Sequence, residues 1–206
     1  ERISPPKRKN YRIPYDDMIT LILKLKNNPG LNKFRGIDGS ILVFLPGIAE
    51  IFRFINQFQY RLKTESNNIN QFLLLPLHSS ISNSEQKNVF LPPQAGITKI
   101  VVSTNIAEAS ITIPDVTIII DSCLVKEMTV NPLSKLSSLV SVFASKDNLR
   151  QRKGRAGRVS EGRCFRFVTK NCYEMEIPDH GTPEMLRISV QRLLLQLQMM
   201  FKDSNQ

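Results

Sequence analysis

Lys99-Ile-Val-Val-Ser-Thr104 and Val116-Thr-Ile-Ile-Ile-Asp121 are short runs of mostly apolar, β-branched residues. Neither run alternates between apolar and polar positions, which is typical of strands that are buried on both faces of a parallel sheet. Three further runs have the same character: Ser40–Leu45, Phe72–Leu77 and Arg163–Val168. The sequence therefore predicts a parallel sheet that is covered on both sides.

Segments of helical composition lie between these strands. They are Ile48–Arg61, Ser84–Phe90 and Lys146–Lys153. Ser82 followed by Glu85 is a capping-box pattern, which marks the start of the second segment. Alternating strands and helices predict an α/β fold, with an open, mostly parallel sheet, right-handed crossovers and helices on both faces. In such sheets, ligands bind beyond the carboxyl ends of the strands.

The two ends of the chain differ from this pattern. A helix is expected over Tyr15–Lys26, and a longer one over Pro183–Phe201. The longer helix carries apolar residues at helical spacing: Leu186, Val190, Leu193, Leu194, Leu197 and Met200. We interpret this stripe as a packing face for an adjoining domain. The predicted organisation is a basic lead-in and helix over residues 1–36, the α/β domain over 37–172, and a linker with the first helix of a following region over 173–206.

Composition limits the class of protein. The 206 residues include 28 Lys and Arg against 18 Asp and Glu, which gives a formal net charge of +10, and 41% are hydrophobic. These values exclude an acidic disordered tail, a collagen-like chain and a fragment too small to form a core. The charge suggests a polyanionic partner, either nucleic acid or an anionic membrane surface, or it serves only solubility.

Neither a membrane span nor a secretion signal is predicted. The apolar runs are far shorter than a bilayer-spanning helix, and residues 1–12 are polar and basic, which we interpret as an internal stretch of a longer protein. Cys123, Cys164 and Cys172 form no C-x-x-C pair, so we expect neither a disulfide framework nor a metal site. A reduced, intracellular environment is the resulting expectation.

The positive charge is concentrated in one short stretch. Residues 146–170 contain nine basic and two acidic residues, which accounts for +7 of the net +10. At the centre of the stretch is Gln151-Arg-Lys-Gly-Arg-Ala-Gly-Arg158. If the preceding helix continues through it, Gln151, Arg155 and Arg158 share one face. Two guanidinium groups and an amide suit the charge on a phosphoryl group during nucleotide hydrolysis, but a nucleic-acid-binding helix or a solvated basic face has the same composition.

Four segments together resemble the superfamily 2 DEAH-box (DExH-box) RNA helicases. Gln151–Arg158 is similar to motif VI of this family, and Thr104–Val116 to motif V. Leu42–Gly47 is similar to motif IV, and Pro76–Ser80 to the segment after the following strand. The four segments occur in the family's order. The resemblance implies the RecA-like fold of the second helicase domain, followed by the start of a winged-helix region at residues 183–200.

Several details resemble one subgroup, the germline helicases of the Spindle-E type that carry a Tudor domain. These details are Asn88–Leu91, the cysteine in Asp121–Leu124, Ile177–His180 and Pro183–Arg187. The Leu-Pro-Pro at 91–93 and the Ile-Pro-Asp-Val at 113–116 are also similar to the DExH helicases of translation initiation, which are the alternative. The first subgroup implies a role in piRNA-mediated transposon silencing, in the cytoplasm and its germ granules rather than in the nucleus.

The resemblance also implies roles around the phosphates of ATP. Gln151 would help to order the attacking water. Arg155 and Arg158 would reach the γ-phosphate, with Arg158 as the arginine finger.

Two further residues are implied contacts of the nucleotide. Phe90 matches the aromatic residue that stacks on adenine, and the alternative for this position is a core residue that closes the helix. Many family members place an acidic residue directly after Ser-x-Thr-Ile. Here Pro114 stands in that place, so Asp115, the next residue, is the expected nucleotide contact or that contact is missing.

Contacts to the RNA backbone are implied as well. The matching residues lie just after strands and are Ser79, Ser80, Thr104 and Asn105. Hydroxyl groups and backbone N–H groups at strand ends are suited to sugar-phosphate contacts. Residues 126–132 and 136–140 resemble the two arms of the β-hairpin that lies near the strand junction, and Lys126 in the first arm is expected to contact RNA.

The chain has neither a P-loop (G-x-x-x-x-G-K-[ST]) nor a D-E-x-H motif. The resemblance places both in a first RecA-like domain, which we expect before Glu1 and which would hold the phosphates and Mg²⁺ of ATP. The expected partners are that domain, single-stranded RNA and piRNA-pathway proteins. We expect the chain alone not to hydrolyse ATP. The alternative is a helicase-like RNA-binding scaffold without ATPase activity.

Overall fold

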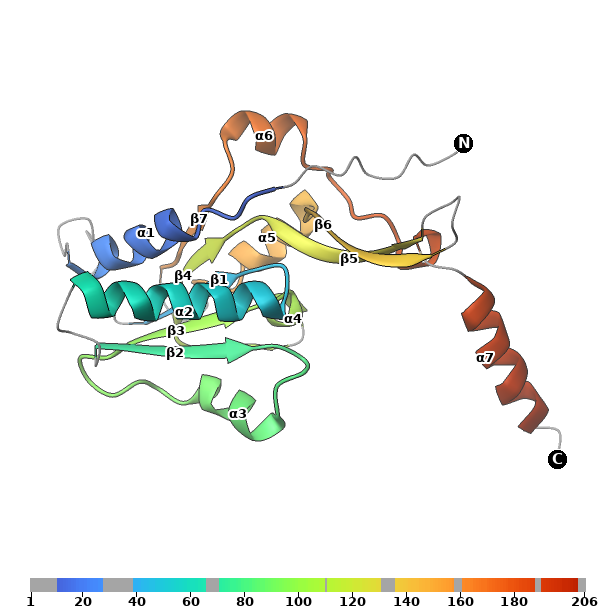
Figure 1. Ribbon diagram of the computed structural model, residues 1–206, viewed down its shortest axis with the longest axis horizontal. Helices are drawn as coiled ribbons and strands as arrows, with labels where there is room; N and C mark the ends of the chain where they lie inside the picture. The colour runs from blue at the N-terminus through green and yellow to red at the C-terminus, as the bar shows by residue number, and fades with distance from the viewer. Residues whose placement is uncertain are drawn as a thin grey trace.

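The computed structural model describes residues 11–27, 39–65, 71–109, 111–130, 136–157, 161–187 and 190–203. Its centre is a five-stranded parallel sheet with the strand order β2-β3-β1-β4-β7 (Figure 1). The strands are β1 (Ser40–Phe44), β2 (Phe72–Leu77), β3 (Thr98–Ser103), β4 (Val116–Asp121) and β7 (Arg163–Arg166). The parallel α/β sheet predicted from the apolar runs is confirmed.

The helices follow the strands in the expected alternation. They are α1 (Tyr15–Asn27), α2 (Ile48–Glu65), α3 (Asn83–Lys87), α4 (Ile106–Ala109), α5 (Lys146–Lys153), α6 (Lys170–Met175) and α7 (Val190–Asp203), with 3₁₀ turns η2 (Asn88–Phe90) and η3 (Glu184–Leu186). The capping box predicted before α3 is present. The Ser82 hydroxyl accepts a hydrogen bond from the Glu85 backbone N–H at 3.4 Å and donates one to the Glu85 carboxylate at 2.7 Å.

Alternate residues of β1 enter two separate cores, one on each face of the sheet. Ile41 and Val43 pack with the buried side chains of α1 and α2, which lie together on one face (Figure 1). Leu42 and Phe44 pack on the opposite face with residues of η2, α4 and the segment before β4. Every residue of β1 is buried as a result, which explains why the strand is apolar from Ile41 to Phe44.

A β-hairpin projects from the carboxyl end of β4 (Figure 1). Its arms are β5 (Leu124–Val130) and β6 (Ser137–Phe143), which pair antiparallel, so the hairpin expected in this part of the chain is present. The preceding residue, Cys123, has a φ of 60°, in the left-handed region that non-glycine residues rarely adopt. The chain therefore turns sharply where it leaves the sheet.

The segment before α7 is tied to this hairpin. The Arg187 guanidinium pairs with the Glu127 carboxylate at 3.2 Å, and the Val130 backbone N–H donates to the Arg187 carbonyl at 3.2 Å. Burial raises the pKa of Glu127, and the charge of Arg187 opposes that effect. Both contacts lie along the first arm of the hairpin.

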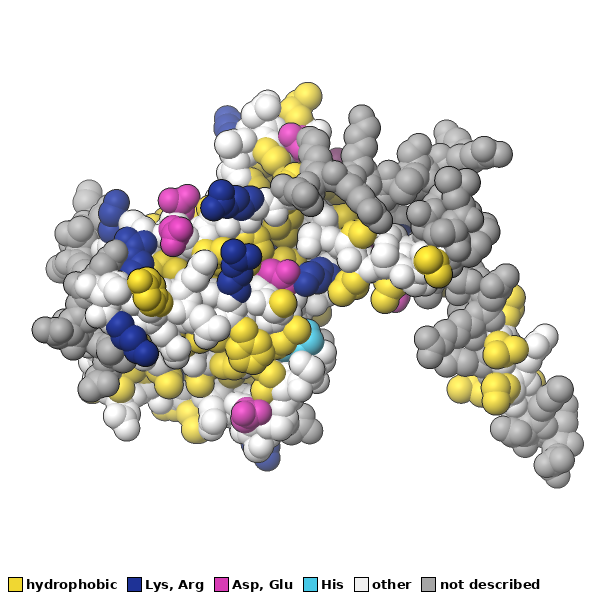
Figure 2. All heavy atoms as spheres, in the orientation of Figure 1, with side chains coloured by type: hydrophobic (Ala, Val, Ile, Leu, Met, Phe, Trp, Pro, Cys, Tyr) yellow, Lys and Arg dark blue, Asp and Glu magenta, His cyan; other side chains and the backbone are white. Residues whose placement is uncertain are grey.

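The single helix predicted over Pro183–Phe201 is wrong. Pro183 precedes the short turn η3, and α7 begins only at Val190. Many apolar side chains of α7 are exposed, and Figure 2 shows them at the lower right: Leu194, Leu195, Leu197, Met199, Met200 and Phe201. Among the described helices, none combines the length and apolar character needed to cross a bilayer. The division of the chain into domains stays a prediction.

Candidate functional site

Four of the five predicted RNA contacts lie in two neighbouring loops at the carboxyl edge of the sheet. Residues 72–77 of β2 pair in parallel with residues 98–103 of β3, so the loops after these strands leave the sheet side by side. The Thr104 backbone N–H donates to the Leu77 carbonyl at 3.4 Å, which joins the two loops. Ser79, Ser80 and Asn105 are exposed, whereas Thr104 is buried. An elongated polyanion could contact all the exposed members from one side.

Local hydrogen bonds hold the turn after β2. The Ser80 backbone N–H donates to His78 Nδ1 at 3.1 Å, and the Ser80 hydroxyl lies 2.7 Å from the same nitrogen. From α3, the Gln86 side-chain amide donates to the His78 and Ile81 carbonyls at 3.1 and 2.8 Å. The exposed hydroxyls are thus presented on an ordered turn.

Lys126 lies at the same edge of the sheet but is already paired. Its ammonium is 2.7 Å from the Glu50 carboxylate, and both side chains are about three-quarters buried. Glu50 is in the first turn of α2, and a Cβ on Gly47 would lie 2.8 Å from Lys126 Nζ. The ammonium therefore sits over the loop after β1. Sequence reasoning gave no sign of this ion pair.

The continuous helix assumed through motif VI is wrong. Helix α5 ends at Lys153, where the backbone N–H of Gly154 donates to the Arg150 carbonyl as the C-cap. Gln151 is exposed on α5, and Arg155 lies half-buried in the turn that follows. The shared helical face expected of the three motif VI residues does not exist, and Arg158 lies outside the described residues.

Glycines make this turn possible. Gly157 has a φ of 81°, in the region that favours glycine. A Cβ on Gly162 would lie 2.5 Å from the Gly157 nitrogen and 2.6 Å from the Ala156 Cβ. The chain thus doubles back closely between α5 and β7.

Arg152 is the central residue of a buried polar network that sequence reasoning missed. Its guanidinium, 1% exposed, pairs with Glu108 through Nε at 3.0 Å and with Asp121 at 2.9 Å. It also donates to the Leu124 carbonyl at 3.3 Å and lies 5.0 Å from the centre of the Phe44 ring. Burial alone would lower the pKa of Arg152, but the charges of Asp121 and Glu108 outweigh it and raise the pKa.

The same network ties the loop after β3 to α5. Glu108 lies in α4, and its backbone N–H donates to the Asn105 carbonyl at 2.9 Å. The Asn148 side chain donates to the second oxygen of the Glu108 carboxylate. A signal for Arg152 was present in the sequence, because Leu149 is the one apolar residue of α5 and Arg152 follows it by three positions. Residues so spaced share a helix face.

The amino end of α5 is held by a segment distant in sequence. Ser145 caps the helix, and the backbone N–H groups of Lys146 and Asp147 donate to the carbonyls of Pro178 and Asp179 at 2.8 and 3.2 Å. The Lys146 ammonium also pairs with the Asp179 carboxylate at 3.0 Å. These bonds satisfy helix N–H groups that have no partner inside the helix.

A histidine and an arginine flank Asp147. Hydrogen bonds from His180 and from Arg150 lower the pKa of the Asp147 carboxyl. This cluster is exposed to solvent.

Phe90 and Asp115, both predicted to contact the nucleotide, lie close together around a third residue. Phe90, in η2, is 42% exposed. The carboxylate of Asp115 pairs with the Lys99 ammonium at 3.0 Å and accepts a hydrogen bond from Ser40. The same ammonium donates to the carbonyls on either side of Phe90. Asp115 thus makes structural bonds, and its predicted contact with a nucleotide stays a prediction.

Three of the predicted nucleotide contacts adjoin, in sequence, one core of the sheet. Phe90, Asp115 and Arg155 are each adjacent in sequence to a residue that packs in the core of the face opposite α1 and α2. These neighbours are Val89, Val116 and Ala156. Exposed Phe90 and the cationic end of α5 suit a base and phosphates, respectively. Among the described residues, no group of three His, Cys, Asp or Glu side chains is arranged to hold a metal ion.

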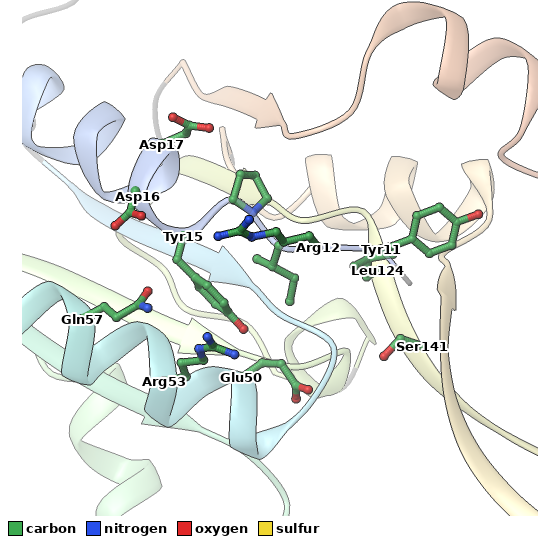
Figure 3. A pocket seen from close by; sticks show the side chains of 12 residues that line it. Tyr11, Arg12, Tyr15, Asp16, Asp17, Glu50, Arg53, Gln57, Leu124 and Ser141 are labelled. Atoms are coloured by element: carbon green, nitrogen blue, oxygen red, sulfur yellow. The ribbon is translucent and has the colours of Figure 1, made fainter. Parts of the chain in front are cut away.

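A cavity of about 560 Å³ lies elsewhere, between the start of α1, α2 and the hairpin (Figure 3). Tyr15 projects into it beside Glu50 and Arg53, whose guanidinium is 5.5 Å from the ring centre. Burial, and secondarily the charge of Glu50, raises the pKa of Tyr15. None of the predicted site residues lines this cavity.

Residues 24–160 match the helicase conserved C-terminal domain. The chain belongs to this family. The helicase C-terminal domain is 48% identical over 165 residues to the "DExH-box ATP-dependent RNA helicase DExH4, chloroplastic" of Arabidopsis thaliana, which is 79% of this chain and 11% of the relative. It is 45% identical to the "ATP-dependent RNA helicase TDRD9" of Danio rerio, over 79% of this chain and 12% of that protein. It is 44% identical to the "Probable ATP-dependent RNA helicase spindle-E" of Drosophila pseudoobscura pseudoobscura, over 77% and 11%.

The helicase C-terminal domain also matches a solved structure. The crystal structure of the E. coli DExH-box NTPase HrpB superposes with a TM-score of 0.75 at 28% identity, covering 92% of this chain and 22% of that one. The RecA-like fold and the resemblance to DExH/DEAH RNA helicases are thereby confirmed. The chain spans about a tenth of the length of these curated relatives. Since the germline proteins and chloroplastic DExH4 are similar to nearly the same degree, identity alone does not single out the germline subgroup.

Proposed function

We propose that this helicase C-terminal domain is the second RecA-like half of an ATP-dependent RNA helicase. In this proposal Gln151, Arg155 and Arg158 complete an ATP site whose phosphate- and Mg²⁺-binding residues lie in a P-loop domain. The loops after β2 and β3 hold the backbone of single-stranded RNA. ATP-driven closure of the two domains then moves the RNA contacts, as ligands bias other hinged domain pairs.

The buried network around Arg152 is the observation that carries this proposal. Arg152 follows Gln151 directly and pairs with Glu108, which is bonded to Asn105. Gln151 and Asn105 are both exposed, so one hydrogen-bonded network links the helix proposed to face the nucleotide with the loop proposed to face RNA. A displacement of α5 on nucleotide binding would therefore displace the RNA loop as well.

The residues present suit the part of ATP assigned to them. Phe90 offers an exposed ring for a base, and motif VI offers cationic groups for phosphates. Magnesium, when bound, neutralises phosphate charge during phosphoryl transfer. The chain's described residues offer no three-ligand site for it, and the proposal assigns it to the P-loop domain.

The test uses a protein that carries this chain together with a P-loop domain. Arg158→Ala should lower RNA-stimulated ATP turnover by roughly 10³, the scale of an arginine finger. Lys170→Ala is the matched control, because it removes an exposed cation from α6, outside motif VI. Turnover near that of the wild type in Arg158→Ala would refute the catalytic role.

The 206-residue chain tested alone provides the complementary experiment. Without a P-loop or a D-E-x-H motif it should not hydrolyse ATP. A metal-dependent ATPase signal that persists through rigorous purification would contradict the assignment of phosphate and Mg²⁺ binding to a separate P-loop domain. If the two-domain protein binds RNA but never hydrolyses ATP, the alternative of a scaffold without ATPase activity replaces this proposal.

RNA binding has its own signature. Contacts to the sugar-phosphate backbone give little sequence preference and an affinity that falls steeply as salt rises. Fluorescence anisotropy with several unrelated single-stranded RNAs at increasing salt measures both properties. A strong preference for one sequence, with weak salt dependence, would argue against backbone recognition.

We further propose that the full protein acts in piRNA-mediated transposon silencing, in the cytoplasm and germ granules together with piRNA-pathway proteins. Support comes from the segments similar to the Spindle-E type and from the relatives named TDRD9 and spindle-E. The test is depletion in germ cells with measurement of transposon transcripts. If transposon transcripts stay unchanged while ribosome loading of messenger RNA falls, the translation-related alternative is correct.

A further inference from the structure

Lys99 is a fully buried lysine whose bonding capacity is completely used. Its ammonium donates to the Val89 carbonyl at 2.8 Å, to the Leu91 carbonyl at 2.9 Å and to the Asp115 carboxylate at 3.0 Å. The side chain is 0% exposed. An ammonium has three N–H donors, and here each one has an acceptor. A buried charge is tolerated when it is paired and hydrogen-bonded in this way.

Two of these acceptors are the backbone groups on either side of Phe90. Val89 is buried in the core, whereas Phe90 is 42% exposed and Leu91 is 59% exposed. Phe90 lies in a three-residue 3₁₀ turn, which has few internal hydrogen bonds of its own. The ammonium of Lys99 therefore supplies bonds that the turn itself lacks.

The third acceptor connects the turn to the sheet. Asp115 accepts a hydrogen bond from the Ser40 hydroxyl, and its carbonyl accepts one from the Ser40 backbone N–H at 2.6 Å. Lys99 is the second residue of β3, Ser40 begins β1, and Asp115 directly precedes β4. Three neighbouring strands thus hold the ammonium in place from one edge of the sheet.

We infer that Lys99 is a positioning residue for base binding, which holds Phe90 in the orientation needed to stack on the base of the nucleotide. This inference rests on the proposed function, since Phe90 is a base contact only in that proposal. The ring needs no ordering when the base arrives, and a preorganised contact binds more tightly than one that must be ordered on binding. Asp115 then serves the base indirectly, by holding Lys99, and not by touching the nucleotide.

The test is a double-mutant cycle in a protein that carries this chain with a P-loop domain. Base stacking on an aromatic side chain contributes enough that Lys99→Met and Phe90→Ala should each raise the KM for ATP about tenfold. Because Lys99 acts through Phe90, the double variant should have the KM of Phe90→Ala alone. The kcat at saturating ATP should stay within about twofold of the wild type in the folded protein.

A purely structural role for Lys99 gives a different result. If Lys99→Met only reduces the amount of folded protein, the apparent kcat falls and the KM for ATP is unchanged. In the double variant, this loss then adds to the effect of Phe90→Ala. An unchanged KM in Lys99→Met, or additive effects in the double variant, overturns the inference. Lys170→Met is the matched control, because it removes a lysine paired with Glu174 at 3.8 Å on the surface of α6. The control should keep the wild-type KM.

Asp115→Asn provides a second variant in case Lys99→Met does not fold. The amide oxygen can still accept from Lys99, but the ion pair is lost, so the KM for ATP should rise about threefold, a fraction of the full stacking effect. An unchanged KM in folded Asp115→Asn overturns the inference. If the wild type is active and the variants have an unchanged KM, only the role of Lys99 is refuted. If the wild type is inactive, the proposed function is refuted, and this inference with it.

Discussion

Replacing Arg152 with methionine should strongly destabilise the domain. Methionine fills most of the space of the arginine side chain but leaves Glu108 and Asp121 buried without their cation. These carboxylates are 7% and 0% exposed. Removing one member of a buried ion pair costs about 3–5 kcal/mol of folding free energy. That loss is a large fraction of the total of about 5–15 kcal/mol typical of a domain.

Urea unfolding followed by circular dichroism measures the effect. With a urea dependence of about 2 kcal/mol per molar, the midpoint of Arg152→Met should fall by about 2 M. Arg150→Met is the control, since the Arg150 side chain is 63% exposed on the same helix. Its midpoint should stay within about 0.3 M of the wild type, as expected of surface substitutions. A shift below about 0.5 M in Arg152→Met would refute the reasoning that the network stabilises the fold.

Three further results are expected. Phe58→Ala should lower the free energy of unfolding by about 3–5 kcal/mol, because Phe58 is 0% exposed and its ring centre lies 5.3 Å from that of Phe72. Calorimetry measures this loss, and a value below about 1 kcal/mol would contradict its place in the core. Ser145→Ala should cost about 1 kcal/mol in urea unfolding through loss of the α5 cap, whereas Ser145→Gly should recover most of it. Burial raises the pKa of the Cys164 thiol to about 11, so its thiolate is scarce at pH 8. Iodoacetamide should label Cys164 roughly a hundred times faster in the urea-unfolded chain, by mass spectrometry, and in the native chain the rate should rise as pH approaches 11; equal rates in both states at pH 8 would contradict the raised pKa.

The sheet was the part of the fold that the sequence predicted best. Burial on both faces favours apolar residues along the centre of a strand, so stretches such as Ile41–Phe44 stand out as uninterrupted runs. The start of α3 was predictable for a local reason, because the Ser82–Glu85 capping pair involves neighbouring residues only. Both signals depend on short-range chemistry.

The ends of the helices and the buried charges could not be predicted in the same way. The segment Gln151–Arg158 has helical spacing, yet α5 stops at Lys153 because Gly157 and the close approach of Gly162 form a turn. Composition also cannot tell which arginine of a basic cluster points inward. Arg152 does so because carboxylates from α4 and β4, distant in sequence, converge on it.

Lys99 illustrates the same limit. A lysine at the start of a strand is usually solvated, so the sequence gives no reason to place it in the core. Its three acceptors come from residues 89, 91 and 115, which only the completed fold brings together. The sequence likewise did not show that Asp115 pairs with Lys99, and its predicted contact with a nucleotide stays a prediction.

The segment from Pro178 to Arg187 is attached at two points, to the amino end of α5 near one end and to the hairpin at the other. A pulling force on the chain beyond Arg187 would be carried by both attachments in turn. The tension would pass first to β5 through Arg187 and then to α5 through Pro178 and Asp179. A displacement of Arg187 would therefore act on the hairpin and on the helix that carries Gln151.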